Sequence, residues 1–290
     1  MKKSVFARSF AILLISCIFC SILSGCGSSS KSSSSEPPVY SPLRVLVPEA
    51  PGSDTLGSSP LTLDVSNITQ GYFAAQSDSA DLVTSLQITA PTGVLYSYFI
   101  EPGENAVIPF TEGDGDYTVV GYQQIQGDQY AALYSETLTV ELENEFLPFL
   151  YPNQYVNFTP DSEACKLALS LLAEDATEQE SIDTVFQYVT QHVTYDEDKA
   201  ATVETGYLPD IDETLSTGKG ICFDYAALMT AMLRSRDIPC KLQIGYAGDI
   251  KHAWIDVYIR SKGWVNQAVS FKGDTWTLMD PTFDSNSDDK

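Results

Sequence analysis

Histidine and basic side chains are scarce in this sequence. Its 290 residues include two histidines, His192 and His252, so a mechanism that needs an imidazole has only these candidates. Lysine and arginine together number 16, against 39 aspartates and glutamates, which gives a formal net charge of −23. Because this charge would repel a phosphate backbone, we do not expect a nucleic-acid partner.

The apolar run near the N-terminus is too short to cross a membrane. It covers Phe10–Leu23, which is 14 residues, whereas a transmembrane helix needs about 20. The run follows a basic start at Lys2, Lys3 and Arg8, and this order is typical of a secretory signal peptide. We therefore predict that residues 1–25 are a signal peptide.

The end of this run resembles a bacterial lipobox. Leu23, Ser24 and Gly25 precede Cys26, and the resemblance implies that Cys26 receives a lipid and becomes the mature N-terminus. Residues 26–59 are rich in serine and proline, which predicts a flexible tether. The protein is then expected outside the cytoplasm, anchored to the bacterial cell membrane by lipid without spanning it. The alternative is an ordinary signal peptide with a chance cysteine.

Export would leave few thiols. Removing residues 1–25 takes away three basic residues and no acid, so the mature charge is −23 − 3 = −26. With lipid on Cys26, the remaining thiols are Cys165, Cys222 and Cys240. An odd number leaves at least one thiol unpaired or paired between chains. We predict that Cys165 and Cys240 are buried thiols, although a bond between them would also leave Cys222 free.

The sequence pattern divides the rest of the chain into two domains. Residues 60–147 alternate apolar and polar positions between turn sequences, and they contain no cysteine or histidine. This predicts an all-β, immunoglobulin-like sandwich with a structural or binding role. Its expected strands are 61–65, 86–88, 94–100, 117–122 and 138–142. Residues 148–160 are expected to be an ordered connection.

The second domain, 161–290, mixes helical and strand patterns and is therefore expected to be α+β. A capping box at Thr177–Glu180 predicts the start of a helix. The acidic residues 196–213 are expected to be irregular, and 214–220 to form a turn. The other expected helices are 161–173 and 222–236, and the expected strands are 241–246, 253–259, 263–269 and 275–279.

Three residues that could take part in catalysis lie at the ends of predicted helices or strands in this domain. Cys222 begins a predicted helix shortly after Gly218 and Gly220, and the helix N-terminus favours a thiolate there. His252 begins one predicted strand and Asp280 ends another. Together they could form a Cys-His-Asp triad.

The sequences around these residues resemble the three motifs of the transglutaminase-like superfamily. Gly218–Leu228 resembles the cysteine motif, His252–Tyr258 the histidine motif and Trp276–Phe283 the aspartate motif, in the family's order. The resemblance covers about residues 161–284 and implies a papain-like fold. It also implies that Cys222 is the nucleophile, His252 the base and acid, and Asp280 the residue that orients the imidazole.

Such a triad acts on amide bonds of a protein or peptide through a thioester. Transfer to an amine gives a new amide, whereas transfer to water gives deamidation or cleavage. We expect a substrate at the cell envelope. A cysteine peptidase with the same triad is one alternative, and an inactive scaffold that binds a surface partner is another. No cofactor or metal is expected, because the acidic stretches match no EF-hand spacing.

The oxyanion donors are less defined by the sequence. The backbone amide of Cys222 is one candidate and Tyr207 is another, because no glutamine lies a few residues before the cysteine. Trp254 either lines the cleft or packs, and we favour packing.

Two further aspartates lie close in sequence to the predicted catalytic residues. Asp224 is expected to interact with the helix end rather than to act in catalysis. Asp256 lies on the same strand face as His252 and is the rival of Asp280.

Overall fold

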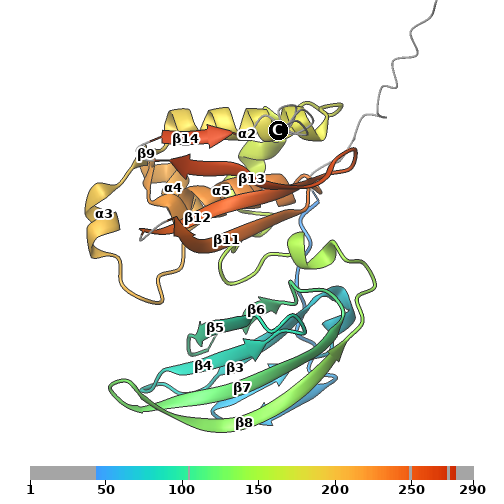
Figure 1. The fold of residues 1–290 in the computed structure, drawn as a ribbon, viewed down its shortest axis with the longest axis vertical. Helices are drawn as coiled ribbons and strands as arrows, with labels where there is room; N and C mark the ends of the chain where they lie inside the picture. Colours follow the sequence, from blue (N-terminus) through green and yellow to red (C-terminus); the bar gives the residue numbers. More distant parts are fainter. Residues whose placement is uncertain (1–43, 104, 248–249, 273–274, 279–290) are drawn as a thin grey trace, which may run out of the picture. The chain divides into compact units, whose positions relative to one another are not determined.

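A computed structural model describes residues 44–103, 105–247, 250–272 and 275–278 (Figure 1). The predicted signal peptide, Cys26 and Asp280 lie outside the described residues. Among the described residues, none of the helices is both long and apolar enough to cross a bilayer.

Eight strands in the first part form two antiparallel sheets, which we call the two-sheet region (Thr55–Val140). In spatial order, the first sheet comprises β1 (Thr55–Ser58), β2 (Leu61–Asp64), β3 (Tyr72–Ser77) and β6 (Asn105–Pro109). The second comprises β5 (Leu95–Ile100), β4 (Thr84–Thr89), β7 (Gly115–Gln126) and β8 (Gln129–Val140).

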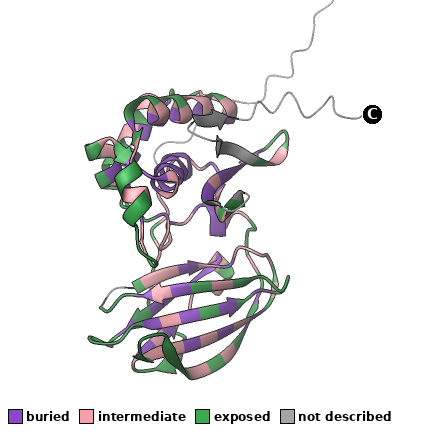
Figure 2. Cartoon of the chain, turned by 60° about the vertical axis from the view of Figure 1, so that its left-hand side comes forward, coloured by how far each residue is buried: buried purple, intermediate pink, exposed green. Residues whose placement is uncertain are grey.

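One apolar core joins these two sheets. Leu63 and Phe73 enter it from the first sheet, and Leu86 and Val119 from the second; all four side chains are fully buried. Figure 2 shows the resulting alternation of buried and exposed positions along the strands. This period of two is the signal that predicted the strands.

The predicted tether extended too far toward the C-terminus. Residues from 44 onward belong to the fold, and β1 pairs with β2. The backbone N–H of Arg44 also donates to the carbonyl of Ser235 at 3.0 Å. The sequence Thr55–Ser58 lacks an apolar alternation because β1 is an edge strand with mostly exposed side chains.

The connection after β8 is held by hydrogen bonds at both ends. It begins with a short 3₁₀ helix, Leu147–Phe149. Gln154 Nε2 then donates to the carbonyl of Phe99 on β5, while the carbonyl of Tyr151 accepts from Arg234 on α5.

The remaining chain, which we call the helix-and-sheet region, combines five helices with one main sheet. Its helices are α1 (Glu163–Leu171), α2 (Glu178–His192), α3 (Glu197–Thr202), α4 (Ile211–Thr217) and α5 (Cys222–Arg234). Its antiparallel sheet contains, in order, β11 (Cys240–Ala247), β12 (Ile250–Ile259), β13 (Gly263–Lys272) and β14 (Thr275–Leu278). The predicted α+β class is confirmed.

Helix α5 forms the centre of this region. It contacts β11 and β12 as well as α1, α2 and α4, and every residue from Asp224 to Arg234 is buried. A helix that is apolar on all sides suits this position, whereas the helices around it bury one face.

The predicted capping box at the start of α2 is confirmed. Glu180 N–H donates to Thr177 Oγ1 at 3.2 Å, and Thr177 N–H donates to Glu180 Oε2 at 2.8 Å. The helix ends at His192, whose ring stacks on that of Tyr188.

The prediction of irregular structure over 196–213 was wrong, as was the simple turn over 214–220. Helix α3 begins after Asp196, and α4 after Asp210, which accepts from two N–H groups of the first turn. Gly218 ends α4 with φ 63°, a conformation that glycine adopts without strain. Lys219–Gly220 (β10) then pairs in parallel with Thr194–Tyr195 (β9).

Cys165 and Cys240 are both buried and unpaired, as predicted. Burial raises the pKa of Cys165 to about 11 and that of Cys240 to about 12. Both thiols are therefore protonated near neutral pH.

Candidate functional site

The turn before α5 places Cys222 at the first residue of the helix. Asp224 Oδ2 accepts a hydrogen bond from Ile221 N–H at 2.8 Å, which caps the helix. A Cβ atom on Gly220 would lie 2.7 Å from Asp224 Cβ, so a larger residue would displace this cap. The expected role of Asp224 at the helix end is thus confirmed.

Cys222 and His252 line the same pocket, of about 220 Å³. The Cys222 thiol comes from α5 and the His252 imidazole from β12, which packs against that helix. The rest of the wall consists of Tyr195, Ala200, Val203, Glu204, Thr205, Gly206, Tyr207, Ile221, Phe223, Ile244, Lys251 and Ala253.

Burial raises the pKa of the Cys222 thiol above its ordinary value. Hydrogen bonds from the backbone of Ala253 and Phe223 act in the opposite direction, whereas the charge of Asp224 adds to the rise. We had expected the helix N-terminus to favour a thiolate, but desolvation is the larger effect here. The resting sulfur is therefore a thiol. The backbone N–H groups of Ala253 and Phe223 already donate to it, and they would stabilise the negative charge of a thiolate.

His252 is 8% exposed, and burial lowers its pKa. The imidazole is therefore neutral near pH 7, which is the form that accepts a proton. It lies opposite Gly245 in the pairing of β11 with β12.

Trp254 packs across the neighbouring strand, as the sequence led us to favour. A Cβ on Gly245 would lie only 2.6 Å from Trp254 Cη2, so the indole occupies the space that a side chain there would fill. Trp254 is two residues from His252 on the same strand face. It does not line the pocket that contains Cys222.

Tyr207 lines the pocket, but its hydroxyl is already engaged. The hydroxyl donates to Asp224 Oδ1 and accepts from Lys199 Nζ. Because a phenol has a single hydrogen to donate, this geometry does not support the predicted role of Tyr207 as an oxyanion donor. Lys199 Nζ also forms a 2.8 Å ion pair with Asp224 Oδ2, so the three side chains form one network.

This network was not predicted from the sequence, although Asp224 gave a signal for part of it. Asp224 interrupts an apolar helix and is 0% exposed, so a buried carboxylate needed a partner. Lys199 and Tyr207 lie 25 and 17 residues earlier in the sequence, and no local pattern links them to Asp224.

The third member of the predicted triad, Asp280, lies outside the described residues. Its rival Asp256 is buried and accepts from Gln243 Nε2 at 3.2 Å. Both Asp256 and His252 project from the same face of β12.

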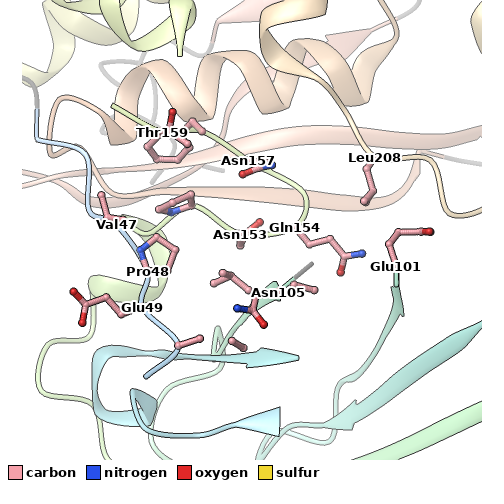
Figure 3. Close-up of a pocket in the computed structure, with 16 residues that line it drawn as sticks. Val47, Pro48, Glu49, Glu101, Asn105, Asn153, Gln154, Asn157, Thr159 and Leu208 are labelled. Atoms are coloured by element: carbon pink, nitrogen blue, oxygen red, sulfur yellow. The ribbon is translucent and has the colours of Figure 1, made fainter. Parts of the chain in front are cut away.

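A second cavity, of about 360 Å³, carries no thiol or imidazole (Figure 3). Amide side chains surround it, including Asn105, Asn153, Gln154 and Asn157, together with Glu49. In the part of the chain that the structure describes, no cluster of three or more histidines, cysteines or acids could hold a metal ion. Of these two cavities, the Cys222 pocket is therefore the one that brings a thiol and an imidazole together.

Comparison with known proteins identifies the same part of the chain. Residues 166–281 match the family model of the transglutaminase-like superfamily. No curated protein matches the sequence.

Three solved structures show weak similarity. A candidate cysteine protease from Cytophaga hutchinsonii is 16% identical, with TM-score 0.36 over 74% of this chain and 68% of its own. A candidate protease from Parabacteroides distasonis is 14% identical, with TM-score 0.33 over 64% and 37%. The periplasmic domain of TgpA from Pseudomonas aeruginosa is 16% identical, with TM-score 0.31 over 79% and 95%. At such low scores these likenesses carry no argument.

The predicted resemblance to the transglutaminase-like superfamily is thus supported by a family-model match over residues 166–281, which spans both Cys222 and His252.

Proposed function

We propose that this protein is a lipid-anchored, extracytoplasmic cysteine enzyme that acts on amide bonds of envelope proteins or peptides. Cys222 is the nucleophile, His252 the base and acid, and Asp280 the residue that orients the imidazole. The observation that carries the proposal is the shared pocket of Cys222 and His252, in which the Ala253 amide hydrogen-bonds to the sulfur.

The proposed reaction proceeds in two halves. His252 takes the thiol proton as the sulfur attacks the amide carbonyl, and it then delivers that proton to the leaving nitrogen. The carbon–nitrogen bond breaks and a thioester remains on Cys222. An amine then attacks the thioester to give a new amide, or water attacks it to give a carboxylic acid. In both cases the thiol is regenerated.

The local backbone supports stabilisation of the oxyanion. The first N–H groups of an α-helix have no partner within the helix, and Cys222 stands at this position on α5. Its own amide, rather than the Tyr207 hydroxyl, is the donor that we assign to the oxyanion.

We propose an immunoglobulin-like arrangement for the two-sheet region. With β2 as strand A, the sheets read A-B-E and C′-C-F-G. Tyr117, near the start of strand F, donates from its hydroxyl to the Gly113 carbonyl at 2.9 Å and accepts from Glu112 N–H at 3.0 Å. A tyrosine with these backbone bonds supports the assignment, because the tyrosine corner is a feature of such sandwiches.

The first experiment measures alkylation of Cys222 by chloroacetamide from pH 5 to 9, with peptide mapping. We compare wild type with His252→Ala, and use Cys222→Ala to define background labelling. We expect His252→Ala to label at least ~10-fold more slowly at pH 7, because general bases contribute factors of this size or more. Equal rates in the two proteins would reject the catalytic pair and favour an inactive scaffold.

A second experiment separates the reactions. Wild type is incubated with a glutamine-containing protein and an alkylamine, and the products are examined by mass spectrometry. Addition of the amine indicates acyl transfer, a gain of one mass unit with ammonia release indicates deamidation, and shorter chains indicate peptidase activity. Each outcome should disappear in Cys222→Ala.

A further inference from the structure

Strand β11 has an open edge next to the catalytic pocket. It is the terminal strand of its sheet and pairs only with β12. Tyr258 N–H donates to the Pro239 carbonyl, which identifies the bonded residue pairs of this antiparallel ladder. Since bonded and non-bonded pairs alternate, the N–H and C=O groups of Leu242 and Ile244 point away from β12.

Three outward carbonyls in the same neighbourhood are capped. The outward carbonyl of Cys240 on β11 accepts from both Nε and Nη2 of Arg234. On the terminal strand β5, the outward carbonyls of Ser97 and Phe99 accept from Tyr155 and Gln154.

Leu242 and Ile244 form an exception to this capping. Among the described residues, their outward backbone groups have no hydrogen-bond partner. Exposed edges promote unwanted pairing, and proteins usually cover them. Leu242 and Ile244 therefore present open main-chain groups along one stretch of β11.

The uncapped stretch lines a groove that runs into the active site. The groove has a volume of about 400 Å³, with Lys241–Ile244 of β11 on one side and Leu95–Tyr98 of β5 on the other. Ile244 and Lys251 line both this groove and the pocket that holds Cys222. A chain lying in the groove would therefore lead directly to the nucleophile.

The rim of the groove is partly apolar and exposed. Leu95 is 57% exposed and Ile244 is 40% exposed. Apolar side chains beside open main-chain groups are the features that bind an extended peptide by strand addition, since the backbone bonds give affinity and the side chains pack.

We propose that the substrate polypeptide binds as an added strand along β11, hydrogen-bonded to Leu242 and Ile244, with its reacting amide at Cys222. This inference rests on the proposed function, because it names the substrate class of that site as an extended polypeptide rather than an isolated amide. The two-sheet region then supplies the opposite wall of the substrate groove.

The test uses alkylating probes with and without a peptide. Acetyl-tetraalanine chloromethyl ketone places a peptide on one side of the electrophile, and chloroacetyl-tetraalanine amide places it on the other. In each case the sulfur forms a carbon–sulfur bond, chloride leaves with the bonding electrons, and the thiol proton is released. The matched probes without a peptide are chloroacetone for the ketone and chloroacetamide for the amide.

We expect at least one peptide probe to label Cys222 of the purified protein ~10-fold faster than its matched probe without a peptide, a factor that two to three net hydrogen bonds supply. N-methylation of single probe residues should remove this gain at alternate positions only, because strand pairing has a period of two. A gain that survives at every methylated position, or no gain from either peptide probe, would overturn the proposal.

A protein variant provides the matching evidence. Leu242→Pro removes the outward N–H without removing a bond to β12, and proline is tolerated at a strand edge. Leu242→Ala loses the same side chain but keeps the N–H. We expect the proline variant alone to lose the peptide gain, measured in each variant as the ratio of the peptide-probe rate to the matched-probe rate. Circular dichroism checks folding, and the N-methyl series carries the test if the proline variant does not fold.

The two proposals fail in different ways. If chloroacetamide labelling is insensitive to His252→Ala, the proposed function falls, whatever the peptide probes show. If labelling depends on His252 but neither peptide probe gains, the enzyme proposal stands and strand addition is excluded.

Discussion

The buried carboxylate of Asp224 has two structural roles in this protein. It caps the helix that carries Cys222, and it binds Lys199 and Tyr207 from the segment that forms the pocket wall. A charge this deep is stable only with partners on all sides, and removal of one partner leaves the other buried and uncompensated.

We predict that Lys199→Met lowers the free energy of unfolding by about 2–3 kcal/mol, because it strips Asp224 of its counter-charge. The control is Lys166→Met at the exposed Lys166–Glu163 pair, where a clearly smaller loss is expected because solvent screens an exposed ion pair. Urea denaturation at pH 7 measures both. Similar losses in the two variants would show that the Asp224 network is not a buried ion pair in solution.

The lowered pKa of His252 predicts a dependence of stability on acid. Its folded-state pKa lies below the unfolded value, so between the two the unfolded chain binds more protons and falling pH favours unfolding. In His252→Gln the loss of stability between pH 7 and pH 5 should be smaller than in wild type. Parallel slopes for wild type and His252→Gln would contradict the burial.

At the level of elements, strands and helices with a clear period could be predicted from the sequence. Strands β2, β4 and β7, and helices α2 and α5, follow directly from apolar spacing. Helices α3 and α4 were missed although their signals were present: Asp196 and Asp210 at the N-caps, and Gly218 after α4. We gave too much weight to the acidic composition of this stretch.

Other elements could not be derived from local sequence. The pairing of β9 with β10 involves two residues in each strand, and β1 has no buried face that would impose a period. The identity of the sheet edges, on which the open backbone of β11 depends, is a property of topology. The positions of Cys222 and His252 were predicted, but the burial that governs their pKa values was not.

The packing between β11 and β12 gives an element-scale prediction. We expect Gly245→Ala to lower the free energy of unfolding by about 1–3 kcal/mol, because the new methyl group must displace the Trp254 indole. The shift should also slow Cys222 labelling, since His252 lies opposite Gly245. Adding Trp254→Leu should reduce the destabilising effect of Gly245→Ala. If the two substitutions are instead additive, the indole does not occupy this space.

At the scale of the whole molecule, aromatic contacts link the connection to both regions. The ring of Tyr155 stacks on Tyr98 of β5 with 5.4 Å between centroids, and it meets Phe223 edge-on at 5.7 Å. Phe223 is the residue after Cys222 and lines the same pocket. Tyr155 of the connection thus links the two-sheet region to the residue beside Cys222.

We therefore predict that the two regions unfold together. All three tryptophans, residues 254, 264 and 276, lie in the helix-and-sheet region, so fluorescence reports on that region while far-ultraviolet circular dichroism reports on both. The two thermal transitions should coincide in wild type, as they do in a two-state system. Tyr155→Ala should separate them. Distinct midpoints in wild type would show that the regions are energetically independent.

The hydrogen bond from Arg44 to Ser235 has a consequence for which substrates the proposed enzyme could reach. It ties the start of the described chain to the end of the helix that carries Cys222. If Cys26 holds the lipid, 18 residues lie between the bilayer and this attachment point, and covalent geometry limits their reach to about 60 Å. The lipid anchor would therefore set a maximum distance between the bilayer and the C-terminal end of α5. Envelope proteins that lie much farther from the bilayer could not reach the Cys222 pocket, however well their sequences fit the groove.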